Sequence, residues 1–284
     1  METKLSVELR TMVMSDLGAV LEIIEAHDED DAEAAESEYE EVGIENQYVL
    51  VDAETVIGVT GYRPVAACDN TYWLSWTYLA EAHRGKGLGK RMLADLLNRL
   101  RDQNGRKIFV KVSDYETPEG EKIYQAALHM YQSLGFELEL INHDFYDEGE
   151  NQMILGLNLR QFGQTDGADA EVKIADEKPD IRFNGLYEIA ETDGAYSFSW
   201  MVKKSAGWFG NRSFSKEDLE LGISSVKNEG GRKVFLTFPS NLALIHRPLQ
   251  SVGFEYVGRL KDYYEVGLDE LHFSHNLKKL ADFN

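Results

Sequence analysis

The stretch L-A-E-A-H-R-G-K-G-L-G-K occupies residues 79–90 and contains the pattern Arg84-x-x-Gly87-x-Gly89. An apolar run precedes it at residues 72–79, and a helical pattern follows it at residues 91–100. Glycines let the backbone approach a ligand closely, and the first N–H groups of a helix have no partner within the helix. Because a helix N-terminus also carries roughly half a positive charge, we expect this turn to bind a pyrophosphate.

Two common phosphate-binding loops do not fit this turn. No Lys-Ser or Lys-Thr pair follows the glycines at the spacing of a Walker loop. No first-strand βαβ unit precedes the turn, as a dinucleotide-binding fold requires. A glycine-rich connection between a strand and a helix, with no ligand at all, is the remaining alternative.

A second pattern lies downstream. Residues 127–136 read A-L-H-M-Y-Q-S-L-G-F, which follows the scheme A-x-x-x-Y-x-x-x-G-F. The two patterns, in this order and about 45 residues apart, resemble the GNAT acyltransferase superfamily over about residues 1–160. In that family the turn Arg/Gln-x-x-Gly-x-Gly/Ala holds the pyrophosphate of acyl-CoA.

The resemblance implies an acetyl-CoA-dependent N-acetyltransferase that moves an acetyl group to a primary amine of a small molecule or protein. The backbone of residues 77–79 would pair with the pantetheine arm like an added strand, and a backbone N–H of that strand would stabilise the oxyanion. Tyr131 matches the tyrosine that assists the leaving thiolate, with packing between helix and sheet as its alternative role. The implied cofactor-binding residues are Thr77, Tyr78, Leu79, Arg84, Gly85, Lys86, Gly87, Leu88, Gly89 and Lys90.

The base for the amine is not identified. Some family members place a Glu on the strand after the turn, where this chain has Lys111, and the usual Asn before the tyrosine is Tyr124. Glu81, a residue near positions 115–116, or water are the candidates. These departures keep open a non-catalytic protein that binds or senses CoA, or serves as a scaffold. A synthase that acylates one specialised metabolite is a third interpretation.

The composition limits the partners. The 284 residues include 50 acidic and 29 basic ones, for a formal net charge of −21. This charge argues against nucleic acids and anionic membranes and favours a cationic acceptor. Residues 28–45 contain ten acidic residues and no Lys or Arg. In the GNAT family this region borders the acceptor site, although a solvated acidic face would show the same pattern.

Several other features are expected to be absent. The single cysteine, Cys68, excludes an intrachain disulfide. Residues 1–4 do not resemble a signal peptide, and no apolar run reaches the ~20 residues that span a bilayer, so we expect a cytoplasmic protein. His27 and His129 have no partners at metal-ligand spacing, so no metal site is expected. A homodimer is left open.

The chain also repeats itself. The sequence G-R-K at residues 105–107 returns at 231–233, and Q-S-L-G-F-E at 132–137 returns as Q-S-V-G-F-E at 250–255. So long a period indicates duplicated domains rather than a solenoid. We therefore predict a GNAT domain over residues 1–160 and a shorter, degenerate GNAT-like domain over residues 171–284. A polar, glycine-rich linker at 161–170 would join them.

The predicted fold class is α/β (α+β). Each domain is expected to have a mixed, mostly antiparallel sheet with splayed central parallel strands flanked by helices. In the first half we predict one central strand over residues 70–79, a helix capped by Ser15, and further helices over 87–103 and 121–134. In the second half the glycine pattern is lost at 203–212, and Leu249 replaces the tyrosine.

Overall fold

The computed structural model describes residues 7–66, 68–160, 180–203 and 216–277. The chain divides into two units by its internal contacts. Unit 1 consists of Met1–Lys111, Ala126–Glu137 and Leu155–Gln164, and unit 2 consists of Val112–Gln125, Leu138–Ile154 and Thr165–Asn284. The second half of the sequence therefore shares its unit with two segments of the first half.

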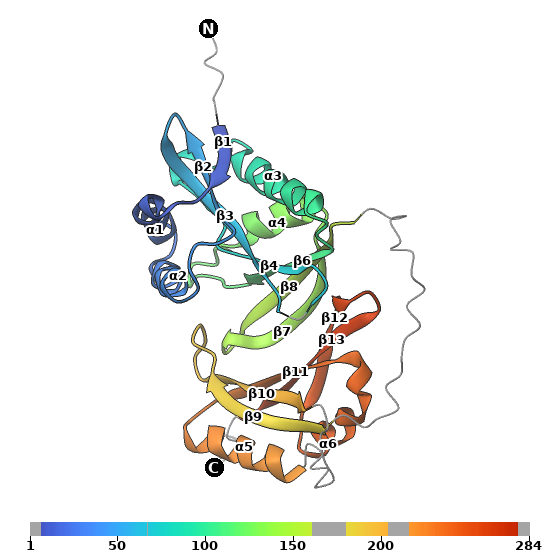
Figure 1. Cartoon of the computed structure of the whole chain (residues 1–284). Coiled ribbons are helices and arrows are strands. Elements are labelled where there is room, and N and C mark those ends of the chain that lie inside the picture. Colours follow the sequence, from blue (N-terminus) through green and yellow to red (C-terminus); the bar gives the residue numbers. More distant parts are fainter. Residues whose placement is uncertain (1–6, 67, 161–179, 204–215, 278–284) are drawn as a thin grey trace. The chain divides into compact units, whose positions relative to one another are not determined.

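The chain contains both helices and strands, which confirms the predicted α/β (α+β) class. Up to residue 160 the elements are β1 Val7–Thr11, the 3-10 helix η1 Met14–Asp16, α1 Leu17–Glu25, α2 Glu29–Val42, β2 Gln47–Asp52, β3 Thr55–Pro64, β4 Thr71–Leu74, β5 Tyr78–Leu79, η2 Glu81–His83, α3 Leu88–Asp102, β6 Lys107–Ser113, α4 Gln125–Ser133, β7 Glu137–Asp147 and β8 Glu150–Asn158 (Figure 1). The later elements are β9 Asp180–Glu188, β10 Ala195–Lys203, α5 Lys216–Asn228, β11 Lys233–Pro239, η3 Ser240–Ile245, α6 His246–Ser251, β12 Glu255–Glu265 and β13 Leu268–Asn276.

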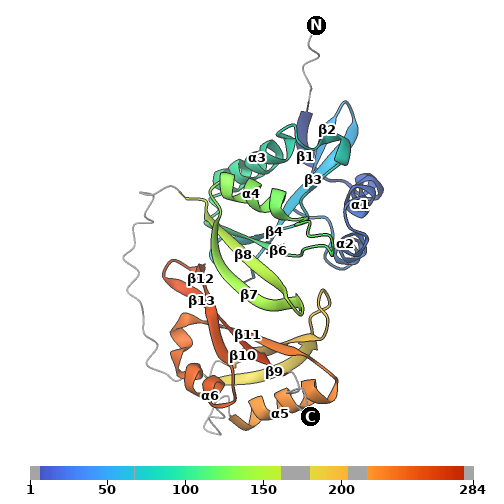
Figure 2. The same ribbon diagram turned by 180° about the vertical axis from the view of Figure 1, so that it is seen from behind.

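Strand β3 lies between two layers of helices. Val59 of β3 is buried together with Ile24 of α1 and Ala35 of α2. A Cβ atom on the neighbouring Gly58 would instead meet the sulfur of Met92 in α3 at 3.2 Å. Because successive strand residues face opposite sides of a sheet, α1 and α2 cover one face and α3 covers the other (Figures 1 and 2).

The first sheet is mixed. Its strand order is β1-β2-β3-β4-β6-β8-β7, and β5 pairs with β3 beside this path. The neighbours β1–β2, β2–β3 and β3–β4 are antiparallel, whereas β4 and β6 are parallel. This arrangement confirms the predicted sheet with parallel strands at its centre.

Two predicted helix boundaries were wrong. The carboxylate of Asp16 accepts hydrogen bonds from Arg10 at 2.7 and 2.8 Å and from the Val13 N–H at 2.9 Å. The chain therefore reaches α1 through the turn η1 rather than through a Ser15 cap. Helix α4 begins later than predicted, because residues 117–121 close a loop in which the Thr117 N–H donates to the Glu121 carbonyl at 2.9 Å.

The second sheet has the order β12-β13-β11-β10-β9. Its β10–β11 pair is parallel, and its other pairs are antiparallel. Taken from the β9 edge, this order matches the order β3-β4-β6-β8-β7 of the first sheet, and in both sheets the first pair is antiparallel and the second is parallel. Helices α5 and α6 also occupy the same places in the chain order as α3 and α4.

The repeated sequence has a repeated backbone conformation. Asp144 and Asp262 both have positive φ, 48° and 51°. Each carboxylate accepts a hydrogen bond from the glycine of the following turn, Gly149 at 2.9 Å and Gly267 at 2.6 Å. The hairpins β7–β8 and β12–β13 therefore share a turn geometry.

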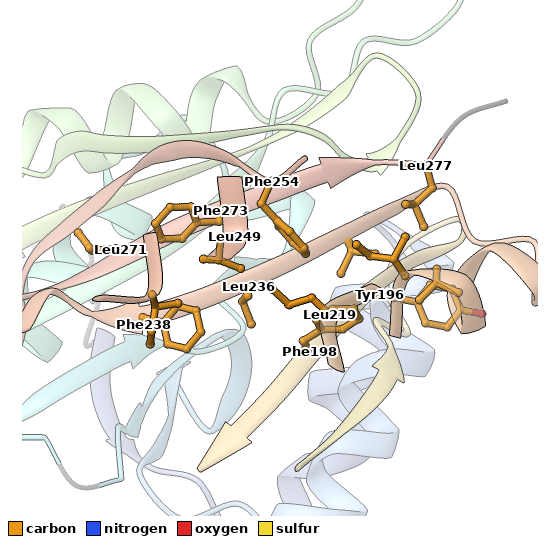
Figure 3. Close-up of a cluster of buried hydrophobic side chains, with 14 residues drawn as sticks. Tyr196, Phe198, Leu219, Leu236, Phe238, Leu249, Phe254, Leu271, Phe273 and Leu277 are labelled. Atoms are coloured by element: carbon orange, nitrogen blue, oxygen red, sulfur yellow. The ribbon is translucent and has the colours of Figure 1, made fainter. Parts of the chain in front are cut away.

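The core of the second sheet is apolar and aromatic (Figure 3). Helix α5 contributes Leu219, Ile223 and Val226, and α6 contributes Leu249, which is fully buried. The leucine at the position that matches Tyr131 thus packs into a core. The predicted linker at residues 161–170 and the segment 204–212 lie outside the described residues. Within the described ranges, no helix is long and apolar enough to cross a membrane.

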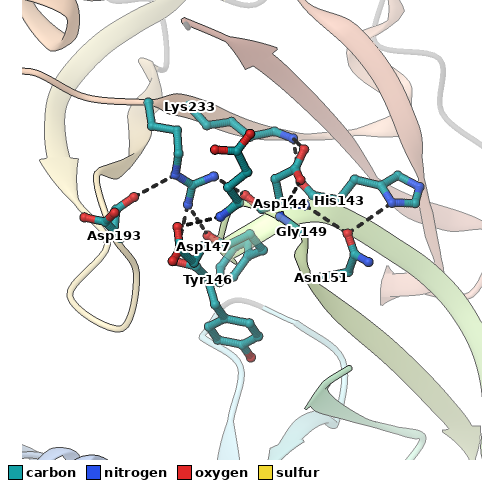
Figure 4. Close-up of polar contacts among 11 residues, drawn as sticks. His143, Asp144, Tyr146, Asp147, Gly149, Asn151, Asp193 and Lys233 are labelled. Carbon is teal, nitrogen blue, oxygen red and sulfur yellow. Dashed lines mark hydrogen bonds and ion pairs between the residues drawn. The ribbon is translucent and has the colours of Figure 1, made fainter. Parts of the chain in front are cut away.

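Unit 2 contains a polar clasp between β11 and the tip of the β7–β8 hairpin (Figure 4). The guanidinium of Arg232 donates to the carbonyls of Asp144 at 2.5 Å, Phe145 at 3.1 Å and Tyr146 at 3.3 Å. The ammonium of Lys233, only 3% exposed, donates to the His143 carbonyl at 2.5 Å and pairs with the Asp144 carboxylate at 3.7 Å. Burial lowers the pKa of Lys233, and the Asp144 carboxylate opposes that shift.

We expect Arg232→Ala to lower the free energy of unfolding by about 2 to 4 kcal/mol, because it leaves several carbonyls of the hairpin without their donor. Urea unfolding followed by circular dichroism measures the change. The control is Arg259→Ala, which removes a half-exposed ion pair with Asp269 and is expected to cost less than about 1 kcal/mol. Equal, small losses in both variants would show that water replaces the donors of Arg232.

Candidate functional site

The central parallel strands separate after a short pairing. The β4–β6 register ends at Trp73 opposite Phe109, although β6 continues to Ser113. The chain leaves strand geometry at residues 75–77 and resumes as β5, which pairs with β3. The sheet is therefore splayed as predicted, but the prediction of one strand over residues 70–79 was wrong.

Hydrogen bonds explain this interruption. The Ser75 N–H donates to the Gly61 carbonyl at 2.9 Å, and the Thr77 hydroxyl donates to the Ser75 carbonyl at 2.9 Å. The same hydroxyl lies 3.0 Å from that of Thr60. Such side-chain bonds to the nearby backbone compete with a regular strand ladder.

The interruption leaves the short strand β5 beside the main strand order, at an edge of the sheet. In the described part of the chain, β5 pairs with β3 and with no strand on its other side. A free edge presents N–H and C=O groups to which an extended molecule can add like a strand. Thr77, Tyr78 and Leu79 all lie in this segment.

The glycine turn follows directly. Gly85 and Gly87 have φ values of +71° and +76°, and a Cβ atom on either would meet nothing within 4 Å. Gly87 is the N-cap of α3, and no side chain caps this helix. Leu88 is buried and fixes the first turn to the core. The start of α3 therefore offers N–H groups, without a side-chain cap, beside open space.

Cationic side chains surround this turn. Arg84, Lys86 and Lys90 are exposed. The Arg84 guanidinium donates to the Leu79 carbonyl at 2.9 Å, and the Lys86 ammonium donates to the Ala82 carbonyl at 2.7 Å. These bonds keep positive charge close to the helix N-terminus, which suits an anionic ligand.

Helix α4 packs beside the first turn of α3. A Cβ atom on Gly89 would meet the sulfur of Met130 at 3.4 Å. Tyr131 is 6% exposed, and its ring centroid lies 5.6 Å from that of Phe136. Burial raises the pKa of Tyr131 above its usual value of about 10, so the phenol stays protonated at neutral pH.

The acidic run has two kinds of residue. Asp28 caps α2, Asp31 accepts a hydrogen bond from the Tyr78 hydroxyl, and Glu38 accepts one from the Trp76 indole at 2.9 Å. The exposed acidic residues are Glu29, Asp30, Glu33, Glu36, Glu40, Glu41 and Glu45. Sequence reasoning missed the first group. The sequence does contain one indication of this group: Asp31 and Glu38 are seven residues apart, and this spacing puts both on one face of the helix.

The candidate bases are not brought together. The Lys111 ammonium lies 5.5 Å from the Trp73 ring centroid, and an ammonium donates hydrogen bonds rather than accepting them. Glu81 is exposed in the first turn of η2. Glu116 belongs to unit 2, where it pairs with Lys122 at 3.8 Å. Among the described residues, no group of three His, Cys, Asp or Glu side chains could hold a metal ion.

Unit 2 contains a cavity of about 460 Å³ lined by β7, β12 and β13. Its lining includes the carboxylates of Glu139 and Glu255 and the ammonium of Lys233. The Glu139 carboxylate accepts from the Lys261 N–H at 2.7 Å, and Lys233 is held by the hairpin clasp. These two charged groups are therefore already engaged within the protein.

A sequence comparison agrees with this geometry. A model of the family described as "Acetyltransferase (GNAT) family" matches residues 17–136, which include the splayed strands, the glycine turn and Tyr131. The matched residues contain both patterns on which the resemblance to this family rests. The family model ends before the second half of the chain. A comparison with curated protein sequences found no match.

Solved structures of acetyltransferases also match this chain. The ribosomal-protein-S18-alanine N-acetyltransferase from Escherichia coli is 18% identical, with a TM-score of 0.44 over 56% of this chain and 97% of that chain. The aminoglycoside 6′-N-acetyltransferase from Enterococcus faecium is 12% identical, with a TM-score of 0.45 over 54% and 98%. YncA from Salmonella typhimurium, solved with its cofactor acetyl-CoA, is 19% identical, with a TM-score of 0.42 over 57% and 99%.

Proposed function

We propose that this chain is an acetyl-CoA-dependent N-acetyltransferase that transfers an acetyl group to a primary amine of a small molecule or protein. One observation carries the proposal. The edge strand β5 at the end of segment 75–79 leads directly into a glycine turn and a helix start without a side-chain cap. A molecule with an amide-containing arm and a pyrophosphate fits that sequence of features.

The residues of the GNAT domain fit CoA. Gly85 and Gly87 leave open the space that a Cβ atom would fill, so the backbone can approach a pyrophosphate. The N–H groups of Leu88, Gly89 and Lys90, with the side chains of Arg84 and Lys86, would hold it. Residues 77–79 would pair with the pantetheine amides. Bound acetyl-CoA supplies the acetyl thioester.

Tyr131 has the properties of a proton donor. As the amine forms its bond to the acetyl carbon, the bond from that carbon to sulfur breaks, and the departing sulfur gains stability from a hydrogen bond or proton. The buried phenol of Tyr131 is protonated at neutral pH, because burial raises its pKa. A backbone N–H of residues 75–79 would stabilise the oxyanion.

One observation favours a second candidate. Lys111 stands where some GNAT enzymes have a basic carboxylate, and its ammonium lies over Trp73. A protein that binds or senses CoA without turnover, or that serves as a scaffold, needs no such base. Release of CoA thiol in the presence of amines separates the two candidates, since only the enzyme releases it.

We also propose that residues 171–284 are a degenerate GNAT copy and that each chain has one CoA site. The matching strand order supports the duplication. Leu249, fully buried at the position of Tyr131, supports the loss of activity in that copy. Calorimetry with CoA and the full chain tests the expected stoichiometry of one.

We expect a cationic amine to be the preferred acceptor, because the exposed carboxylates of α2 raise the local concentration of cations. Thiol release with a panel of polyamine, basic-peptide and neutral amines tests this. For the best cationic amine, kcat/KM is expected to fall several-fold as salt rises to about 1 M, where the Debye length is about 3 Å. A neutral best acceptor, or a flat salt profile, would contradict the expectation.

The acceptor test is best made with exposed carboxylates of α2, because changing them does not disturb hydrogen bonds within the protein. The triple change Glu33→Gln, Glu36→Gln and Glu40→Gln should raise the acceptor KM and flatten the salt profile, with the KM for acetyl-CoA unchanged. Asp28 and Asp31 are unsuitable, because one caps α2 and the other binds Tyr78.

A further inference from the structure

Two carboxylates of α2 bind the aromatic side chains of segment 75–79. The Glu38 carboxylate accepts a hydrogen bond from the Trp76 indole N–H at 2.9 Å. The Asp31 carboxylate accepts a short hydrogen bond from the Tyr78 hydroxyl. Trp76 and Tyr78, two residues apart in the segment 75–79, are thus tied to one helix. Both rings also pack against the buried cluster shared by α1, α2 and β3.

Glu38 is part of a larger network. Its second oxygen accepts from Arg63 Nε at 2.8 Å. Arg63 also donates to the Gly43 carbonyl at 2.7 Å and the Glu45 carbonyl at 3.2 Å, at the C-terminal end of α2. Arg63 lies in β3 opposite Trp73, the last β4 residue in register with β6. Glu38 therefore connects the end of α2, the central strand β3 and segment 75–79.

Asp31 is half-buried and surrounded by titratable groups. Burial raises its pKa, the Tyr78 hydroxyl opposes that shift, and Asp28, Asp30 and His27 contribute smaller effects. The His27 ring stands edge-on to Tyr78 with centroids 5.3 Å apart. Asp31 therefore differs from the exposed acidic residues of α2, which face solvent.

Segment 75–79 has little regular strand pairing, so the contacts of its side chains with α2 add to the few backbone and hydroxyl hydrogen bonds that hold it. Strand β6 does not pair with it in the described structure, and β5 contributes only two residues of pairing with β3. Backbone donors that bind a developing charge act best when their positions are fixed before the reaction, and a displacement of about 1 Å can cost about 100-fold in rate.

We propose that Glu38 and Asp31 are positioning residues of the acetyl-transfer site: they hold Trp76 and Tyr78 and thereby fix the backbone of residues 75–79 for the thioester. This inference rests on the proposed function. It separates α2 into a face that shapes the CoA-binding segment and an exposed face that attracts the acceptor.

The main test replaces Glu38 by Gln. An amide has one acceptor oxygen, so it cannot serve both Trp76 and Arg63 as the carboxylate does. We expect the indole N–H signal of Trp76 to shift in nitrogen-15 NMR spectra. We also expect kcat/KM for acetyl-CoA to fall about tenfold with every amine tested. Asp31→Asn should act in the same direction through Tyr78.

The matched control is Glu22→Gln, which removes the same charge. Glu22 is an exposed residue of the neighbouring helix α1. This change should leave the indole signal and the kinetic constants for acetyl-CoA unchanged. If the only change is a higher KM for the acceptor, and it disappears at high salt, the positioning role is overturned. Glu38 would then act by attracting the cationic acceptor.

Trp76→Phe keeps the test decisive if Glu38→Gln unfolds the protein. It removes the indole donor, identifies the Trp76 signal by its loss, and leaves the Glu38–Arg63 pair intact. Combining it with Glu38→Gln should add little further loss in kcat/KM if the two residues act through their shared bond. Fully additive losses, or wild-type kinetics in Trp76→Phe, overturn the inference. Failure of the wild-type chain to bind CoA would instead overturn the proposed function.

Discussion

Gly87→Asp is expected to weaken CoA binding at least 100-fold while the protein stays folded. The aspartate places a negative charge at the start of α3, where the pyrophosphate would lie. Its carboxylate can also accept hydrogen bonds from the first N–H groups of the helix, since aspartate is a favourable N-cap residue. The new side chain therefore competes for the donors that CoA needs. Calorimetric titration with CoA measures the loss.

The same change has a small expected effect on stability. A left-handed conformation costs roughly 1–2 kcal/mol for a residue other than glycine, and the gain of a cap offsets about 1 kcal/mol of it. Gly87→Asn supplies the cap without the charge, so its CoA affinity should lie between those of the wild type and Gly87→Asp. Gly230→Asp is the second control, because Gly230 also has positive φ and open space but lies in unit 2. Unchanged affinity in Gly87→Asp would remove the basis of the proposed CoA site.

Much of the first half of the chain could be predicted from local patterns. Helix α3 was predicted within one residue at each end, because its buried leucines repeat at helical spacing and Gly87 marks its start. The parallel centre of the sheet followed from the resemblance to GNAT proteins. These features depend on short stretches of sequence and on a topology that many chains share.

The errors fall where particular hydrogen bonds, rather than the spacing of apolar residues, decide the backbone. The strand break at residues 75–77 depends on Gly61 and Thr60 of β3, which lie far away in the sequence. The entry to α1 depends on the pairing of Arg10 with Asp16. No periodicity in a single segment reports such partners.

The role of α2 was likewise only half predictable. Composition indicated an acidic surface, and the resemblance to GNAT proteins placed it near the acceptor site. Asp31 and Glu38 turn inward because they bind Tyr78 of β5, Trp76 of the segment before β5, and Arg63 of β3. Charge counts treat all ten acidic residues as equal, whereas burial and hydrogen bonding divide them into two groups.

Tyr131→Phe is expected to lower kcat by roughly 100-fold to 10,000-fold, the range of general acid catalysis, with a much smaller change in the KM for acetyl-CoA. Phenylalanine keeps the ring packed against Phe136 and removes only the hydroxyl. Because burial raises the pKa of Tyr131 above about 10, its ionisation should not limit kcat at neutral or mildly alkaline pH. Single-turnover measurement of thiol release isolates the chemical step.

The matched control is Tyr62→Phe, another buried tyrosine of unit 1, whose hydroxyl donates to Gln103 at 3.0 Å. Its loss should cost about 1 kcal/mol of stability and leave kcat unchanged. If Tyr131→Phe behaves like this control, its hydroxyl serves packing and the sulfur obtains its proton from solvent. If instead kcat falls while binding of CoA and the melting temperature stay constant, the hydroxyl acts on the reacting atoms. That result would also favour the enzyme over the CoA-binding protein without turnover, since a binding protein has no chemical step for Tyr131 to assist.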